Sequence, residues 1–309
     1  MNKNSKIFIS GHKGLVGSAI VNYLKKKNFT KIYSIEKKKL DLRNQSKVLN
    51  FFRKNKFDYV INCAGKVGGI HANNKYRAEF LYDNLAMQTN IIHSSYLTKV
   101  KSLIFLGSSC IYPKYSKIPM KEEALLSGKL EETNEPYAIA KIAGIKMCES
   151  YNRQYKTNFK CLMPCNLYGP NDNYDLDNSH FLPALIKKIS NTKISNNNIV
   201  HIWGTGKPKR EVMYVEDLAD ACLYFLQKKT SHSLINIGSG VERSILDYAK
   251  IIAKIFNKKI HFKFDKSKPD GMKRKLVDTK LAKTYGWKSK IALDEGLKRT
   301  IAAFQNKKN

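Results

Sequence analysis

A hydroxyl and a thiol lie two residues apart in the stretch SSCIYP, at Ser108 and Cys110. The stretch follows the apolar run Leu103-Ile104-Phe105-Leu106, which is typical of a buried strand. In an extended chain, residues two apart point to the same side, so both groups would meet whatever binds there. Hydroxyls and thiols are groups that donate hydrogen bonds or exchange protons with a substrate. Taken alone, Cys110 is also compatible with a small core residue, because free Cys is usually buried.

A second pair of reactive side chains lies at Tyr137 and Lys141, in the stretch NEPYAIAK. Pro136 predicts that a helix begins immediately before them, and residues four apart share one helix face. A Lys ammonium near the phenol, together with the charge of a nicotinamide, would lower the Tyr pKa from about 10 and allow proton exchange near neutral pH. This spacing occurs by chance in many helices, so the pair indicates catalysis only in combination with the glycine loop and with Ser108.

Three glycines follow the first apolar strand, at Gly11, Gly14 and Gly17, and lead into a helical pattern. Glycines there permit a tight turn and let the backbone approach a pyrophosphate, which the free N–H groups of the helix N-terminus would bind. Because the loop lies in the first strand-helix unit, it predicts dinucleotide binding.

The charged residues of the glycine loop and of the end of the second predicted strand give conflicting indications of which dinucleotide binds, NAD or NADP. Glu36 occupies the position of an acidic residue that holds the ribose 2′-hydroxyl of NAD. Lys13 in the glycine loop and Lys37 beside Glu36 would neutralise a 2′-phosphate, which favours NADP(H). Asp41 is a candidate adenine contact. The alternative is that Glu36 and its Lys neighbours form a solvated turn.

Apolar runs alternate with helical patterns through the first half of the chain, which predicts a parallel sheet covered on both faces. The predicted fold is α/β: a Rossmann-type doubly wound parallel sheet with a smaller C-terminal α/β substrate domain. We expect an NADP-binding domain over residues 1–165, with elements near 212–237 folding back onto it, and a substrate domain over 166–309. The predicted strands of the first half are 6–10, 31–36, 59–64, 102–108 and 159–163, and its predicted helices are 14–27, 45–55, 79–97 and 137–154.

The chain of 309 residues is strongly basic, with a net charge of +31. Of its 56 basic residues 48 are Lys, and they are scattered from Lys3 to Lys308. Bidentate reading of bases and phosphates favours Arg, so we expect a solvated Lys surface with no nucleic-acid or membrane partner. The six Cys lie mostly in apolar runs without metal-ligand spacing, so no metal site is expected. The N-terminus enters a strand directly, and we expect a cytoplasmic protein.

The spacing GxxGxxG resembles the short-chain dehydrogenase/reductase superfamily, particularly its extended members. Longer stretches, spanning residues 10 to about 276, resemble one family within it, the GDP-L-fucose synthases, which are 3,5-epimerase/4-reductases. These stretches are GHKGLVGSAI, KVGGIHANN, FLGSSCIYP, NEPYAIAKIAGIKMCESYNRQY, NLYGPNDNYD, SHFLPAL and KPDGMKRKL. The resemblance implies that Ser108 hydrogen-bonds a carbonyl, Tyr137 protonates it, and Lys141 tunes Tyr137 and binds the nicotinamide ribose.

The resemblance also implies that Cys110 and His180 are an acid/base pair for epimerisation. A C4 ketone acidifies the protons at C3 and C5, so a thiolate can remove one from one face and an imidazolium can return one from the other. Ser108 and Tyr137 would stabilise the enolate oxygen. Without the resemblance, His180 is an ordinary exposed or capping residue of a polar loop.

Further binding residues follow from matching positions. Lys188, Trp203, Arg210 and Asp270 are expected to contact the sugar nucleotide; Trp203 could instead be a packing residue and Lys188 a surface residue. The expected cofactor contacts are Gly11, His12, Lys13, Gly14, Leu15, Val16, Gly17, Lys37, Asp41, Leu106, Gly107, Ser108, Ser109, Lys141, Pro164, Cys165, Asn166, Leu167 and His180.

Three features depart from the family pattern: Cys165 stands where Thr is common, Lys13 and Lys37 replace Arg, and the segment 227–234 is short. The leading hypothesis is conversion of GDP-4-keto-6-deoxy-D-mannose to GDP-L-fucose with NADPH. The alternative is a C4-reductase or epimerase-reductase of another GDP-4-keto sugar, such as a 6-deoxyheptose. A basic nucleic-acid-binding protein with a degenerate Rossmann domain is the competitor from another class. The resemblance further implies a homodimer.

Overall fold

The computed structural model describes residues 1–176, 179–192, 198–268 and 270–306. Its centre is a six-stranded sheet in the order β2-β1-β3-β4-β5-β9, in which every neighbouring pair is parallel. The predicted doubly wound sheet is therefore confirmed. The strands are β1 (Ile7–Ser10), β2 (Ile32–Tyr33), β3 (Tyr59–Asn62), β4 (Ser102–Leu106), β5 (Phe159–Pro164) and β9 (Leu234–Ile237).

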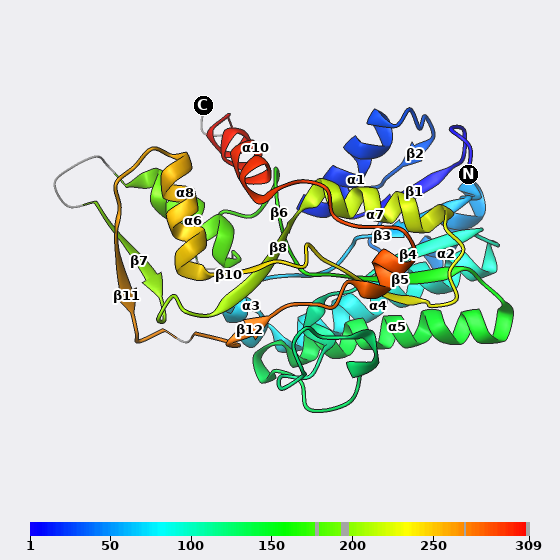
Figure 1. The fold of residues 1–309 in the computed structure, drawn as a ribbon. Helices are drawn as coiled ribbons and strands as arrows, with labels where there is room; N and C mark the ends of the chain where they lie inside the picture. Colours follow the sequence, from blue (N-terminus) through cyan, green and yellow to red (C-terminus); the bar gives the residue numbers. More distant parts are fainter. Residues whose placement is uncertain (177–178, 193–197, 269, 307–309) are drawn as a thin grey trace.

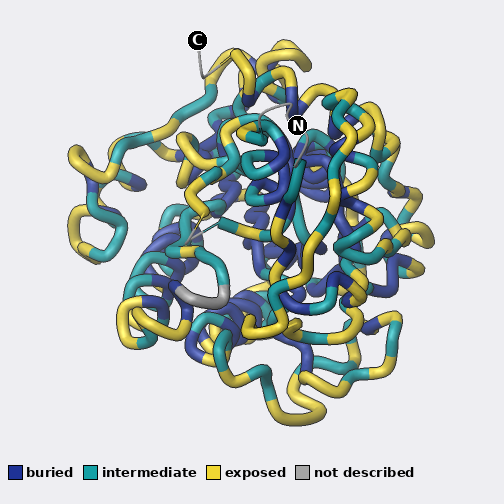
Figure 2. Tube along the Cα trace, turned by 90° about the vertical axis from the view of Figure 1, so that its left-hand side faces the viewer, coloured by how far each residue is buried: buried dark blue, intermediate teal, exposed yellow. Residues whose placement is uncertain are grey.

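The strands of this sheet are mostly apolar and buried because helices cover both of its faces. All residues of β1, β4 and β5 are buried. Helices α1 (Leu15–Lys26) and α7 (Val215–Gln227) pack together on one face, and α2 (Gln45–Asn55), α4 (Arg77–Leu97) and α5 (Glu135–Tyr155) cover the other (Figure 1). Figure 2 shows buried segments in the interior of the molecule and exposed segments around its rim.

The second strand and the segment before α4 differ most from the sequence-based expectation. The second strand is two residues long instead of 31–36, since β2 is the sheet edge and has β1 as its neighbour in the sheet. Beyond it the chain turns, with the backbone N–H groups of Lys39 and Leu40 donating to the Glu36 carbonyl. The short helix α3 (Ile70–Lys75) precedes α4 and was not predicted.

The second half builds around β8 (Lys209–Tyr214). This strand pairs with β6 (Asn166–Tyr168), β10 (Glu242–Ser244) and β12 (Arg274–Lys275). A separate parallel pair joins β7 (Ile199–Trp203) to β11 (His261–Asp265). The remaining elements are η1 (Ser109–Ile111), η2 (Glu122–Ala124), η3 (Glu132–Asn134), α6 (Phe181–Asn191), α8 (Ile245–Ile255), α9 (Lys280–Thr284) and α10 (Leu293–Asn306).

The two halves have separate hydrophobic cores. The larger core surrounds the main sheet and includes residues of α7 and β9, which return to that sheet from the second half. The smaller core lies among α6, α8, α10 and the strands β6, β7 and β8. Residues far apart in the sequence therefore share the larger core, while the division at residue 165 remains a prediction.

Candidate active site

The glycine loop forms a cradle at the carboxyl end of β1. Gly11 has φ +70°, in the left-handed region that favours glycine. A Cβ at Gly17 would lie 2.2 Å from the Gly11 carbonyl oxygen, so no other residue fits without a shift of the loop. Helix α1 begins after Gly14, and among the described residues no side-chain hydrogen bond caps its N-terminus. Its free N–H groups and positive end therefore suit a pyrophosphate, and the residues present fit a bound dinucleotide.

A cavity of about 500 Å³ opens beside this cradle, at the carboxyl ends of β1, β3, β4 and β5. In doubly wound sheets, ligands bind in the crevice where the strand order reverses, and here that reversal lies between β1 and β3. The cavity brings together most of the predicted site residues: Gly11, Gly14, Leu15, Val16, Gly17, Leu106, Gly107, Ser108, Cys110, Tyr137, Lys141, Pro164, Cys165, Asn166, Leu167 and His180.

Lys141 is held at the floor of this region. Its side chain is 4% exposed, and its Nζ donates a hydrogen bond to the Leu106 carbonyl oxygen at 2.9 Å. The same Nζ lies 5.7 Å from the centroid of the Tyr137 ring. Burial lowers the pKa of Lys141 to about 8, because an ammonium loses hydration there.

Tyr137 does not have the lowered pKa that the sequence argument expected. Burial raises its pKa, the charge of a Cys110 thiolate raises it further, and a hydrogen bond with Ser108 opposes the rise without reversing it. The expectation combined Lys141 with the charge of a nicotinamide, whereas this pKa reflects the protein groups alone. Lys141 also donates its hydrogen bond to a carbonyl oxygen and not to the phenol. Tyr137 is therefore a protonated phenol at neutral pH, which is the state needed to donate a proton.

Cys110 has the opposite character. The Nζ of Lys275 donates a hydrogen bond to Cys110 Sγ at 3.1 Å, and Ser108 Oγ accepts one from the Cys110 backbone N–H at 3.3 Å. Burial by itself would raise the pKa of the thiol, but the Lys275 charge and the hydrogen bonds involving Ser108 and Lys275 outweigh it, so the pKa is lowered. A thiolate is thus favoured relative to an ordinary Cys.

His180 immediately precedes α6 and lines the same cavity. Solvent reaches part of the residue, yet the protein around its ring removes enough hydration to lower the pKa. The Lys275 charge lowers it further. In the protein alone, His180 is therefore a neutral imidazole at neutral pH.

Five of the predicted cofactor contacts do not line the cavity: His12, Lys13, Lys37, Asp41 and Ser109. Lys13 pairs with Glu36 at 2.9 Å, and both side chains are solvent-accessible. Lys37 is exposed and His12 is half-buried, while Ser109 is buried in η1. Asp41 is held by Arg43, whose guanidinium keeps its pKa down at about 2 and also contacts Asp83 at 2.8 Å.

The four predicted sugar-nucleotide residues form a second group, in and around the strands of the second half. Lys188 Nζ donates to the His201 carbonyl at 3.0 Å and lies 5.6 Å from the Trp203 ring centroid. Trp203 is 47% exposed, so its ring is open to a ligand. Arg210 donates to the Asp270 carbonyl at 3.4 Å, and the Asp270 carboxylate accepts hydrogen bonds from Thr205.

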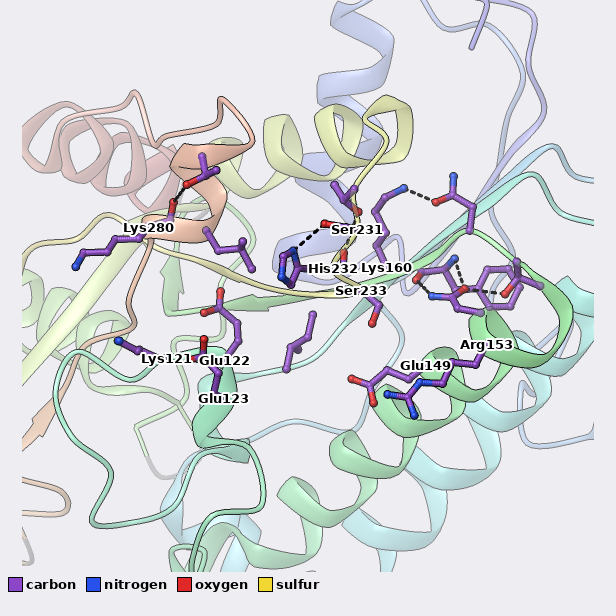
Figure 3. A pocket seen from close by; sticks show the side chains of 18 of the residues that line it. Lys121, Glu122, Glu123, Glu149, Arg153, Lys160, Ser231, His232, Ser233 and Lys280 are labelled. Carbon is purple, nitrogen blue, oxygen red and sulfur yellow. Dashed lines mark hydrogen bonds between the residues drawn. The ribbon is translucent and has the colours of Figure 1, made fainter.

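A larger cavity, of about 900 Å³, lies at the amino ends of the strands, next to the first residues of β5 and β9 (Figure 3). Figure 3 shows both acidic side chains, such as Glu122 and Glu149, and basic ones, such as Arg153 and Lys160, around this cavity. Among its described lining residues there is no predicted site residue and no glycine loop. We therefore place the candidate active site in the smaller cavity.

Comparison with known proteins shows the family of the chain. The profile of the NAD dependent epimerase/dehydratase family matches residues 7–238. The chain belongs to this family. Within the NAD dependent epimerase/dehydratase family, it is 48% identical to GDP-L-fucose synthase 1 of Arabidopsis thaliana, over 97% of this chain and 93% of the relative. It is 45% identical to GDP-L-fucose synthase of Escherichia coli (strain K12), over 97% and 96% of the two chains.

A solved structure is similar over almost its entire length. The Campylobacter jejuni protein MlghC, a GDP-mannoheptose C4 reductase with NADP bound, superposes with a TM-score of 0.90 at 39% identity, covering 99% of both chains. Among the residues that the structure describes, no group of three or more His, Cys, Asp or Glu side chains could hold a metal ion. Within the same residues, no helix is sufficiently long and apolar to cross a membrane.

Sequence reasoning missed several residues of this site, and three of them carry reactive or polar side chains next to the predicted ones. Cys63 and Asn134 line the cavity, and Lys275 contacts Cys110. Asn134 stands just before the helix that carries Tyr137, and Lys275 lies within the recognised stretch KPDGMKRKL. That stretch was the available signal for Lys275, but it could not show which side chain the lysine would meet.

Proposed function

We propose that the chain is a bifunctional 3,5-epimerase/4-reductase that converts GDP-4-keto-6-deoxy-D-mannose to GDP-L-fucose with NADPH. The observation that carries the proposal is the convergence of Ser108, Tyr137 and Lys141 with the Cys110 thiol and His180 in one cavity beside the glycine cradle. The relatives named GDP-L-fucose synthase support it.

The residues proposed to hold NADPH begin with the glycine loop, where the first turn of α1 would bind the pyrophosphate. Lys13 and Lys37 would neutralise a 2′-phosphate, and Asp41 would lie beside the adenine. Lys13 must first exchange its Glu36 partner for the phosphate. When bound, NADPH supplies the hydride for C4. The MlghC structure with NADP bound supports this cofactor.

The epimerisation would use Cys110 and His180 on opposite faces of the sugar. The Cys110 thiolate takes the proton from C3 or C5, and the C–H electron pair moves into an enolate on the C4 oxygen. Ser108 and the protonated Tyr137 donate hydrogen bonds to that oxygen. A His180 imidazolium then donates a proton to the other face, which inverts the carbon. The negative substrate diphosphate would raise the His180 pKa and so supply the imidazolium.

The reduction would use the same oxygen-binding groups. As C4 accepts hydride, Tyr137 donates its phenolic proton to the oxygen, and Ser108 keeps its hydrogen bond. Lys141 would bind the nicotinamide ribose and stabilise the tyrosinate that forms. The raised pKa of Tyr137 favours the reduction direction, because it keeps the donor protonated before the transfer.

The nucleotide would lie on the second half of the molecule. Trp203 offers an exposed ring for the guanine, and Lys188 and Arg210 offer cations for the phosphates. Asp270 would contact the base or ribose. These roles follow from matching positions and from the clustering of the four side chains around β7 and β8.

A C4-reductase or epimerase-reductase acting on another GDP-4-keto sugar is the second candidate. The similarity to MlghC, described as a GDP-mannoheptose C4 reductase, favours it. Both candidates share the cavity and differ in the substituent accepted at C6 of the sugar.

We also propose a cytoplasmic homodimer. Helices α4 and α5 pack together and leave large apolar side chains exposed on one layer of the molecule, including Tyr82 (65%), Ile139 (44%) and Tyr155 (44%). Sedimentation of the unaltered protein and of Tyr82→Glu tests the dimer: the unaltered protein should sediment as a dimer and the variant as a monomer.

The function is tested by incubating the purified protein with GDP-4-keto-6-deoxymannose and either NADPH or NADH, and identifying the sugar nucleotide by NMR. We expect GDP-L-fucose, formed faster with NADPH. A product reduced at C4 without inversion at C3 and C5 would instead identify a simple reductase. Turnover of a GDP-4-keto-heptose alone would support the second candidate.

A further inference from the structure

Lys275 connects the two halves of the molecule at the thiol. Cys110 lies in η1, directly after a strand of the main sheet, whereas Lys275 lies in β12 of the second sheet. The two residues are 165 positions apart in the chain, yet the Lys275 ammonium donates to Cys110 Sγ at 3.1 Å. Nothing in the roles assigned above uses this lysine.

The backbone around Lys275 is fixed from both sides. β12 pairs in parallel with β8, and two residues later the Val277 N–H donates to the buried carboxylate of Glu211 at 3.0 Å. On the other side, the Met120 N–H donates to the Leu276 carbonyl at 2.8 Å, and Met120 and Val277 form an isolated parallel bridge. The ammonium is therefore carried by a strand anchored in both halves.

The charges around Cys110 come from several elements. Lys275 favours the thiolate, while the Glu131 carboxylate, from the loop before η3, opposes it. Tyr137 of α5 adds a protonated phenol, and its own pKa is raised by the thiolate. His180 also experiences the Lys275 charge. Among these groups, Lys275 is the cation in hydrogen-bond contact with the sulfur.

We propose that Lys275 keeps Cys110 in the thiolate form and thereby makes it the base of the epimerisation. The proposal rests on the function proposed above and deepens it. During the step, the proton passes from the sugar carbon to sulfur, the C–H electron pair enters the enolate, and Lys275 retains its own protons. Lys275 is a positioning residue because it acts through Cys110.

The contact has a second consequence for the pH dependence of the exchange. Proton exchange requires a thiolate, which sets the acidic limb of the profile, and an imidazolium, which sets the alkaline limb. The Lys275 ammonium lowers the pKa of both groups. Removing the charge should therefore move both limbs to higher pH, whereas a purely structural lysine would reduce the rate without moving them.

The test measures the rate at which iodoacetamide alkylates Cys110 as a function of pH, with the adduct on the Cys110 peptide quantified by mass spectrometry. In the unaltered protein we expect half-maximal reactivity below the ordinary thiol range. Lys275→Met should slow alkylation at neutral pH at least about tenfold, the change expected for one pKa unit. Lys275→Arg should restore the rate to within about threefold, since it retains the charge.

Lys273→Met is the matched control, because Lys273 is an exposed lysine two positions away on the same segment; its alkylation profile should equal that of the unaltered protein. An unchanged midpoint in Lys275→Met would overturn the proposal. If that variant does not fold, the unaltered protein alone tests the proposal. A midpoint of Cys110 alkylation at or above the ordinary thiol range would also overturn it.

Failure of this inference can be distinguished from failure of the proposed function, since alkylation needs no substrate. A protein that forms GDP-L-fucose but shows an ordinary Cys110 midpoint retains its function and loses the role of Lys275. With substrate present, exchange of the C3 and C5 protons with D₂O gives the second readout. Both limbs of its pH profile should lie at higher pH in Lys275→Met and remain in place in Lys275→Arg.

Discussion

Cys110 and Tyr137 line the same cavity and are both partly buried, but they favour opposite protonation states. The pKa of Cys110 is lowered and that of Tyr137 is raised, although burial disfavours ionisation of both. Each has a lysine nearby. Lys275 donates directly to the thiol sulfur, whereas Lys141 donates to the Leu106 carbonyl and lies 5.7 Å from the phenol ring centroid.

The difference shows that the proximity of a lysine does not by itself ionise a buried acid. A cation stabilises the ionised form most when it contacts the charged atom, because charge-assisted hydrogen bonds are stronger than neutral ones. With one lysine on sulfur and the other on a carbonyl oxygen, a base and an acid can exist together at one pH. That combination is what an epimerisation followed by a reduction at the same ketone requires.

The largest expected effect comes from removing the acid. Tyr137→Phe should slow NADPH consumption by about 10²–10⁴-fold, the usual contribution of general acid catalysis, as measured by cofactor absorbance. Exchange of the C3 and C5 protons should continue, because Ser108 still donates to the enolate oxygen. Tyr82→Phe, on the exposed face of α4, is the control and should behave like the unaltered protein. Unaltered cofactor consumption in Tyr137→Phe would show that another group donates the proton.

Removing the base should give the complementary result. Cys110→Ser should slow incorporation of solvent deuterium at C3 and C5, measured by NMR, by about 10²–10³-fold, because a hydroxyl is a far weaker acid than a thiol. NADPH should bind with unchanged affinity by fluorescence titration, since Cys110 is not a predicted cofactor contact. Deuterium incorporation at the unaltered rate would remove Cys110 from the mechanism.

A smaller effect should appear in the pH profile of reduction. Burial lowers the pKa of Lys141 to about 8, so the ammonium is present below that pH and is lost as the pH rises through it. Measured in single-turnover experiments, the rate of reduction should therefore fall above about pH 8, whereas the exchange rate should lack this limb because Lys141 does not contact Cys110. Lys141→Arg should move the limb to higher pH; a limb that stays in place would assign it to another group.

The smallest effect should come from the acidic neighbour of the thiol. Glu131→Gln removes a negative charge that raises the pKa of Cys110 while keeping an oxygen that can accept from the Asn134 N–H. The midpoint of Cys110 alkylation should move to lower pH by less than one unit. A move in the other direction would mean that the charge balance around the thiol is wrongly assigned.

The elements that carry the site could be predicted because their signals are local. The glycine loop, the apolar run before Ser108 and the Pro before Tyr137 each indicate a strand end or a helix start within a few residues. The convergence of these ends then follows from the parallel sheet. The short β2 could not be predicted as readily, because its length depends on its position at the sheet edge.

The protonation states could not be predicted from the sequence. Cys110 depends on Lys275, and their contact requires β12 to pair with β8 and to be anchored by Met120 and Glu211. β12 is only two residues long, so the sequence shows no hydrophobic periodicity from which it could be predicted. Tyr137 was expected to have a lowered pKa through Lys141, which shares its helix face, together with the charge of a nicotinamide. Spacing does not reveal that Lys141 donates to the Leu106 carbonyl.

The most direct test of the account is deuterium exchange by the unaltered protein with GDP-4-keto-6-deoxymannose in D₂O, with NADP⁺ in place of NADPH. If a Cys110 thiolate and a protonated Tyr137 act in turn on one ketone, NMR should show deuterium at C3 and C5 while no C4-reduced sugar forms. Adding NADPH should then yield GDP-L-fucose that carries this deuterium. A C4-reduced product that retains its original protons at both C3 and C5 would contradict the account.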